Sequence, residues 1–393
     1  MAATRYNMLI VDDEISNLQK LRRTFFGDFR IFEALTGQDA IQLLREQDVD
    51  VIITDQRMPE TTGVDVLRES LLLQPEAVRI ILTGYTEIDY LMNAINEGQV
   101  HRYITKPWEP FSLKRTVMQD LELVHVKREN RLLQEQLRIA RQVQSRLFPQ
   151  KLPEIPTLNY TGICQPAGAV GGDYYDVLKV SPDQFCLAVG DISGKGISAA
   201  LLMASLQALL RSHASQTTED LAAVVTEMNR LLCSMTEESR FATLFCAVYD
   251  DSTRELTYVN AGHNPPLLFR RGASGADIQP ATAFGSAEPS SNGIIRLEGS
   301  GAVLGMFPEG SYEHRSLPLE PGDTLVIYTD GITEAQDSRG REYGEERLTE
   351  LVRSRISLPP VELQDQLLNS VKQFAGEVPL ADDLTLLLVK AVE

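Results

Sequence analysis

The segment from Ser112 to Leu147, SLKRTVMQDLELVHVKRENRLLQEQLRIARQVQSRL, contains neither glycine nor proline. Along it, apolar and a few polar residues recur with the alternating three- and four-residue spacing of a two-stranded coiled coil: Leu123, Val126, Asn130, Leu133, Leu137, Ala140, Gln144 and Leu147. The spacing predicts a connecting helix roughly 50 Å long at 1.5 Å per residue. Because such a helix cannot bury its own stripe, we expect a homodimer paired along it. A plain spacer, or a helix packed on its own domain, is the alternative.

The helix divides the 393 residues into three expected parts, 1–111, 112–148 and 149–393, and the length allows two separate cores. A net charge of −18 disfavours a nucleic-acid partner. The four cysteines form no CxxC pair, which is typical of reduced thiols inside a cell. No apolar run approaches the roughly 20 residues that span a bilayer. No signal peptide precedes the first strand, so we expect a soluble cytoplasmic protein without a membrane partner.

Strand-type and helix-type runs alternate through residues 1–111. The strand-type runs are Tyr6–Val11, Arg30–Ala34, Val51–Thr54, Arg79–Thr83 and His101–Ile104. The helical stretches between them are Ser16–Phe26, Gln38–Glu46, Val64–Leu72 and Ile88–Glu97. Five βα units with short connections predict an α/β domain, a doubly wound five-stranded parallel sheet. In such sheets ligands bind outside the carboxyl ends of the strands.

Polar residues stand at those strand ends: Asp12, Asp13, Asp55, Thr83 and Lys106. Three converging carboxylates suit a hard divalent cation, and Mg²⁺ is the best match. A lysine and a hydroxyl at the same edge would meet the oxygens of a phosphoryl group, which makes Asp55 a nucleophile that forms an acyl phosphate. An aspartate after a strand is most often a helix N-cap. Five such residues at strand ends nevertheless favour the phosphoryl site.

The first part resembles a response-regulator receiver domain. The matching motifs are Val11–Glu14, Asp55–Pro59, Leu82–Gly84 and Ile104–Trp108. The resemblance implies that Asp55 accepts phosphoryl from a sensor histidine kinase or a phosphotransfer protein. It implies Mg²⁺ bound by Asp12, Asp13 and Asp55, with Thr83 as the switch hydroxyl and Lys106 as the phosphate contact. Tyr103 would be the aromatic switch residue, unless it is a plain edge-strand residue.

The third part begins at a proline-rich boundary, Pro149–Pro156, which ends the helix. Its strand-type runs are Phe185–Val189, Thr243–Tyr249, Leu256–Val259, Thr324–Tyr328 and Leu384–Val389. Its clearest helices are Ile197–Ser212, Thr218–Met235 and Pro360–Phe374. The strands have hairpin spacing, so we expect an α+β domain in which antiparallel sheets are flanked by helices.

Carboxylates recur at the ends of these strands, several of them beside a glycine: Asp173, Asp191, Asp330, Asp382 and Asp383. Converging carboxylates without a His/Cys ligand set favour two Mn²⁺ or Mg²⁺ ions over zinc. A pair of such ions activates water and neutralises phosphoryl oxygens. Asp-Gly is also a common turn, and Asp191 could simply cap the following helix. Nearby Lys195 is either a solvated charge in a tight loop or a phosphate contact.

This part resembles the PPM (PP2C-like) phosphatases, especially the bacterial SpoIIE/RsbU-like branch, from about residue 140 to 390. The matching motifs are Val170–Asp176, Asp191–Gly196, Asn260–Pro266, Asp330 and Asp382-Asp383. The resemblance implies a PP2C-like β-sandwich flanked by helices. It also implies metal-dependent removal of phosphate from phosphoserine or phosphothreonine of a protein, usually a STAS-type anti-anti-sigma factor.

Carried over by position, the resemblance implies a ligand set with Asp191 bridging two metals and Asp330 and Asp382 completing one site. Asp173 and the backbone carbonyl of Ile192 would add ligands, and Asp383 would either orient Asp382 or bind metal itself. Asp191 and Asp330 are the expected catalytic positions. His263 is either a turn-stabilising residue or an acid. One departure is that Gly168-Ala169 stand where family members often carry a basic residue.

The sequence therefore predicts a response regulator whose output is a protein serine/threonine phosphatase in a sigma-factor partner switch. Phosphorylation of Asp55 would alter pairing or rotation of the connecting helix. The alternative is a non-catalytic adaptor that binds a sigma-regulatory partner when the receiver is phosphorylated.

Overall fold

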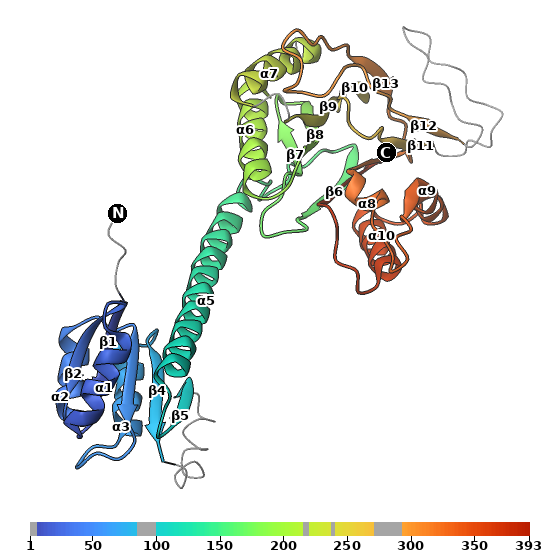
Figure 1. Ribbon diagram of the computed structural model, residues 1–393. Helices are drawn as coiled ribbons and strands as arrows, with labels where there is room; N and C mark the ends of the chain where they lie inside the picture. The colour runs from blue at the N-terminus through green and yellow to red at the C-terminus, as the bar shows by residue number, and fades with distance from the viewer. Residues whose placement is uncertain (1–5, 85–99, 215–219, 237–239, 271–292) are drawn as a thin grey trace. The chain divides into compact units, whose positions relative to one another are not determined.

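The computed structural model describes residues 6–84, 100–214, 220–236, 240–270 and 293–393. The chain forms two compact units, Met1–Gln136 and Leu137–Glu393 (Figure 1). No helix in the described ranges is both long enough and apolar enough to cross a bilayer.

The first unit is a parallel five-stranded sheet in the order β2-β1-β3-β4-β5. Its strands are β1 (Tyr6–Val11), β2 (Phe29–Ala34), β3 (Val51–Asp55), β4 (Val78–Thr83) and β5 (Arg102–Thr105). Its described helices are α1 (Ile15–Phe25), α2 (Gly37–Glu46), α3 (Gly63–Leu73) and the start of α5 (Pro110–Gln144). The α/β prediction is confirmed. The predicted helix Ile88–Glu97 lies outside the described residues.

The sheet is buried on both faces, which explains its continuous apolar strands. Along β1, Met8 and Ile10 pack in one apolar cluster, which includes residues of α1 and α5. Leu9 and Val11 pack in another, with residues of α2 and α3. Successive side chains point to opposite faces of a strand, so one short run contributes to both cores.

Helix α5 has 35 residues and begins two residues before the predicted start. Proline is favoured at the first helical position, and the carboxylate of Glu109 accepts hydrogen bonds from the backbone N–H groups of Phe111 and Ser112. The first turns pack on the sheet, whereas the next part carries an exposed apolar stripe. Leu123, Val126 and Leu133 in that stripe are 53%, 48% and 50% exposed.

The predicted dimer seam is wrong at its last two positions, Gln144 and Leu147. The side chain of Gln144 is buried, and its Nε2 donates to the carbonyl oxygen of Gly171 at 2.6 Å. Its Oε1 accepts from the backbone N–H of Gly171 at 3.1 Å. Leu147 packs against the core of the second unit. The spacing predicts an apolar stripe but not its partner, and here residues of the same chain cover its end.

The second unit consists of two five-stranded antiparallel sheets, in the orders β13-β10-β9-β8-β7 and β12-β11-β14-β15-β6. The first sheet contains β7 (Tyr174–Lys179), β8 (Gln184–Ile192), β9 (Ala242–Asp250), β10 (Glu255–Ala261) and β13 (Arg315–Pro318). The second contains β6 (Leu158–Gln165), β11 (Leu267–Phe269), β12 (Ile294–Arg296), β14 (Thr324–Tyr328) and β15 (Leu384–Ala391).

Helices cover the outer faces of both sheets, so the prediction of an α+β sandwich is confirmed. The helices are α6 (Ile197–His213), α7 (Leu221–Met235), α8 (Asp330–Thr333), α9 (Gly344–Ser354) and α10 (Pro360–Ala375). In β8, Leu187 and Val189 face the other sheet. Cys186 and Ala188 pack with residues of α6 and α7. Strands β6 and β7 and the short strands β11, β12 and β13 were not predicted.

Candidate functional sites

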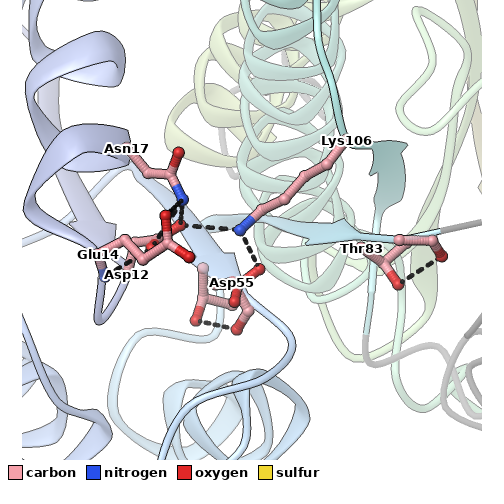
Figure 2. Close-up of polar contacts among 8 residues, drawn as sticks. Asp12, Glu14, Asn17, Asp55, Thr83 and Lys106 are labelled. Carbon is pink, nitrogen blue, oxygen red and sulfur yellow. Dashed lines mark hydrogen bonds and ion pairs between the residues drawn. The ribbon is translucent and has the colours of Figure 1, made fainter.

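In the first unit, two carboxylates and one lysine meet at the carboxyl ends of the strands. Lys106, which follows β5, places its Nζ 3.0 Å from Oδ2 of Asp12 and 2.6 Å from Oδ1 of Asp55. Figure 2 shows the lysine reaching between the two carboxylates, which come from the ends of β1 and β3. The parallel order of the strands brings together residues that are distant in sequence.

The same edge has a donor set that fits a hard cation. Carboxylate oxygens of Asp12, Asp13 and Asp55 lie within 4.8 Å of one another. All-oxygen coordination by carboxylates is what Mg²⁺ requires. Sequence reasoning missed Asn17, whose Nδ2 donates to both oxygens of Asp12 at 3.1 Å (Figure 2). Its position in the first turn of α1, five residues after Asp12, was the signal that the sequence offered.

The other predicted residues of this unit occupy neighbouring positions. Thr83 ends β4 and is buried, with its hydroxyl donating to the carbonyl oxygen of Gly84 at 3.3 Å. Tyr103 lies on edge strand β5 and is 42% exposed. Burial raises the pKa of Asp55, and the bonds from Lys106 oppose that shift. The pKa of Lys106 is raised, because its bonds to Asp55 and Asp12 outweigh the opposing effect of burial.

In the second unit, predicted ligands from both sheets gather at one end of the sandwich. Asp173 directly precedes β7, and Asp191 is the penultimate residue of the antiparallel β8. Asp330 begins α8 shortly after β14, and Asp382 stands just before β15. The hydroxyl of Thr329, which sequence reasoning missed, donates to Oδ2 of Asp173 at 2.7 Å and so links the two sheets.

Asp383 binds the loop that carries Asp173. Its Oδ2 accepts from the backbone N–H groups of Gly172 at 2.6 Å and Asp173 at 3.3 Å, and its Oδ1 accepts from Ala167 at 2.8 Å. A Cβ on Gly171 would lie 2.2 Å from this carboxylate, so only glycine fits there. Asp383 therefore orients a loop rather than Asp382 alone, and metal binding by it stays a prediction.

The Ile192 carbonyl lies close to the same loop. Its oxygen would stand only 3.0 Å from a Cβ on Gly172, so the absence of a side chain there lets the two backbones approach. Its role as a backbone ligand stays a prediction.

Three carboxylates of this site have raised pKa values, partly because of the charges of neighbouring carboxylates. The pKa of Asp191 is raised to about 6, first by burial and then by the charge of Asp330. Burial, followed by the charge of Asp191, raises the pKa of Asp173 well above its ordinary value. The pKa of Asp330 is raised by burial and then by the charge of Asp382. Buried like charges are costly unless cations neutralise them, so this donor set fits hard divalent ions.

Two further residues of the matching motifs, Asp176 and His263, have local structural partners. Asp176 is fully buried and accepts from the Tyr174 hydroxyl at 2.6 Å and from Nε of Arg211 at 2.8 Å. His263 is buried, with Nδ1 2.9 Å from the Thr243 hydroxyl oxygen, and burial lowers its pKa to about 4. A histidine that is neutral near pH 7 and buried fits the turn-stabilising interpretation better than the acid.

Two family models match the chain. The model for Stage II sporulation protein E (SpoIIE) matches residues 181–392, more than half of the chain. The chain belongs to the SpoIIE family. The response regulator receiver domain model matches residues 8–118. The sequence therefore combines a receiver domain with a SpoIIE-family domain, as its motifs predicted.

Two named proteins and one solved structure are similar to most of this chain. Protein IcfG of Synechocystis sp. is 27% identical over 77% of this chain and 48% of its own length. Phosphoserine phosphatase RsbU of Bacillus subtilis is 27% identical over 66% of this chain and 70% of its own. The SiaA-PP2C domain of Pseudomonas aeruginosa shares the fold, with a TM-score of 0.55 and 21% identity over 67% of this chain and 99% of that chain. The chain spans about half the length of IcfG.

In the SpoIIE-family domain, Gln144 supports the loop that leads to Asp173. Replacing Gln144 by alanine removes two hydrogen bonds and leaves the buried polar groups of Gly171 unpaired. We expect a loss of about 1 to 3 kcal/mol in the unfolding free energy of this domain. Urea denaturation followed by circular dichroism measures the loss. Gln142→Ala, in the exposed turn before it, is the control and should be neutral; equal stability of the two variants would contradict the assignment.

The raised pKa of Asp191 predicts a pH dependence of the metal-free SpoIIE-family domain. Between about pH 4 and pH 6 the folded state binds a proton that the unfolded state, with a pKa near the ordinary 3.8, does not bind. The charged carboxylate therefore destabilises the fold above about pH 6, and this penalty is lost as the pH falls towards 4. In EDTA, Asp191→Asn should exceed the wild type in stability at pH 7, and the difference should shrink at pH 5. A difference independent of pH would refute this.

Proposed function

We propose that this chain is a response regulator whose SpoIIE-family domain removes phosphate from phosphoserine or phosphothreonine on a partner protein. The observation that carries the proposal is the convergence of Asp173, Asp191, Asp330 and Asp382 at one end of the sandwich. The raised pKa values of Asp173, Asp191 and Asp330 mark a concentration of negative charge that a structural role does not need.

The proposed roles follow from the position of each donor. Asp191 interacts with both Asp173 and Asp330, which suits a carboxylate shared by two ions. In this proposal Asp173 and the Ile192 carbonyl would add ligands beside Asp191, and Asp330 and Asp382 would complete one metal site. Two Mn²⁺ or Mg²⁺ ions would activate water and neutralise phosphoryl oxygens. Thr329 and Asp383 orient Asp173 and its loop for this task.

For the receiver domain we propose that Asp55 accepts phosphoryl from a histidine kinase or a phosphotransfer protein, with Mg²⁺ bound by Asp12, Asp13 and Asp55. Lys106 already contacts the Asp55 carboxylate, so it stands where oxygens of a new phosphoryl group would lie. Thr83 and Tyr103 are the proposed switch residues. In support, Thr83 ends β4, which is next to the acceptor strand β3, and Tyr103 lies on β5, which pairs with β4.

The substrate that we propose is the phosphoserine of a STAS-type protein in a sigma-factor partner switch. The support is similarity to RsbU, which is named a phosphoserine phosphatase. The test is Mn²⁺-dependent release of phosphate from a phosphorylated STAS protein by the full chain. Phosphate release that also occurs in EDTA would refute the proposed metal-dependent phosphatase. The absence of phosphate release from any phosphoserine protein would refute it as well.

The rival proposal is a non-catalytic adaptor, and the residues around Gly168-Ala169 favour it. The segment 166–173 has no basic side chain that could bind a substrate phosphate. If the chain is an adaptor, its Asp191→Ala variant would still bind the STAS protein. The wild type would release no phosphate. The phosphatase proposal predicts the opposite result for the wild type.

We also propose that 1–111 is the receiver, 112–148 the linker and 149–393 the phosphatase, and that the chain dimerises along the linker. The support is the exposed stripe of Leu123, Val126 and Leu133, with Asn130 between them. Exposed stripes of this kind in soluble helices mark interaction surfaces. Phosphorylation of Asp55 would then alter the pairing of α5. Light scattering of the wild type and of Asn130→Leu tests the pairing.

A further inference from the structure

The proposed phosphatase site has a problem of charge. A phosphate monoester carries up to two negative charges at neutral pH, and the site presents a set of acidic side chains: Asp173, Asp191, Asp330, Asp382 and Glu334. The pKa of Glu334 is itself raised by burial and by Asp330. Metal ions bound by these aspartates would offset part of the negative charge of the site. A cationic side chain that reaches the same carboxylates would offset more and would bind phosphate oxygens directly.

Lys195 is such a side chain. Its Nζ lies 3.0 Å from Oδ2 of Asp382 and donates to the carbonyl oxygen of Ala381. It also counts among the charges that lower the pKa of Asp330, against the larger effects of burial and Asp382. The lysine side chain is 61% exposed, so it is free to turn towards an incoming ligand. It therefore stands at the edge of the carboxylate site and remains accessible from solvent.

The loop around Lys195 is built to hold it there. The backbone N–H of Ser193 donates to the carbonyl oxygen of Phe241, and the N–H of Phe241 donates to the Ser193 hydroxyl, both at 2.9 Å. Gly194 and Gly196 have φ values of 93° and 77°, which other residues rarely adopt. The loop thus turns sharply on both sides of the lysine, directly after Asp191.

A second cation, Arg240, approaches the loop from the segment that leads into β9. Nη1 of Arg240 lies 3.2 Å from the point that a Cβ on Gly194 would occupy. The pairing of Ser193 with Phe241 fixes this approach, because Arg240 directly precedes Phe241. The loop from Ser193 to Gly196 therefore concentrates positive charge on one side of the carboxylates, whereas segment 166–173 supplies none.

We propose that Lys195 is the phosphate-binding residue of this site and that the Ser193–Gly196 loop, supported by Arg240, recognises the phosphoryl group of the substrate. The inference rests on the proposed phosphatase function for its substrate class. The same lysine competes with a metal ion for Asp382, because both are cations that bind the same carboxylate. Lys195 therefore has opposite effects on the two ligands: it strengthens phosphate binding and weakens metal binding.

The experiment measures two equilibria with the full chain by isothermal titration calorimetry: Mn²⁺ with the metal-free protein, and orthophosphate with the Mn²⁺-loaded protein. For Lys195→Ala we expect orthophosphate affinity to fall about tenfold or more, as for loss of a charge-assisted hydrogen bond. We expect Mn²⁺ affinity to rise, because Asp382 loses its competing cation. Lys195→Gln keeps most of the length of the side chain without its charge. It should change both affinities in the same directions as Lys195→Ala.

The control is Lys372→Ala, an exposed lysine on α10 that should change neither affinity. Orthophosphate affinity within twofold of the wild type in both Lys195 variants would overturn the proposal. A loss of affinity for both ligands in both variants would also overturn it, since that pattern indicates a loop that no longer folds. Neither titration requires turnover. A wild type that binds orthophosphate but releases none from phosphoproteins would refute the proposed phosphatase function. The binding test of Lys195 would still be valid in that case.

Discussion

Asp191→Ala is expected to abolish Mn²⁺-dependent phosphate release, with a fall of about 10³-fold or more in kcat/KM. Asp191 interacts with both Asp173 and Asp330, so its loss would affect both proposed ion positions. Bound ions contribute several kcal/mol to stabilising charge in a phosphoryl-transfer transition state, and about 1.4 kcal/mol corresponds to a factor of ten. The measurement is the rate of phosphate release from a phosphorylated STAS protein at saturating Mn²⁺.

The stability of the same variant separates lost chemistry from lost folding. In EDTA, Asp191→Ala removes a half-buried charge that its neighbours repel, so it should unfold at a higher urea concentration than the wild type at pH 7. Asp183→Ala is the matched control, because Asp183 is exposed just before the other end of the same strand, β8. Full activity of Asp191→Ala, or an equal loss in Asp183→Ala, would remove the support for a metal role.

Asp55→Asn is expected to form no acyl phosphate. The incorporation of label from acetyl phosphate should therefore fall by at least about 10²-fold. A carboxylate can attack phosphorus and form the acyl phosphate, whereas an amide is a poor nucleophile. The variant is nearly isosteric and still accepts a hydrogen bond from Lys106, so the sheet edge should keep its shape. Mn²⁺-dependent phosphatase activity of the full chain, measured with and without acetyl phosphate, should respond in the wild type and not in the variant.

Asp48→Asn serves as the control in the receiver domain. Asp48 is exposed in the connection that precedes β3, at the opposite end of that strand from the acceptor. It should be labelled as fast as the wild type. Labelling of Asp55→Asn at the rate of the wild type would place the acceptor elsewhere. A response of the phosphatase to acetyl phosphate that survives in Asp55→Asn would separate the signal from this aspartate.

Much of the fold was predictable, because its strands follow simple burial rules. Strands β1 and β8 face apolar surroundings on both sides, so they form continuous apolar runs that are visible without any structure. Strands β6 and β7 were harder to predict. Thr161 and Asp176 interrupt their apolar runs, and those side chains bond to Gln364 and Arg211 more than 30 residues away. Nothing local in the sequence indicates such partners.

The sequence by itself determined the chemistry of the site: which residues are carboxylates, which of them end strands, and that two modules are joined by a helix. Only the tertiary structure decided how these groups are used. Asp383 binds the backbone of a loop more than 200 residues away, and Gln144 turns from the expected dimer seam to Gly171 of its own chain. The spacing of residues defines which face of a helix or strand they share. The element that covers that face depends on contacts between distant parts of the chain.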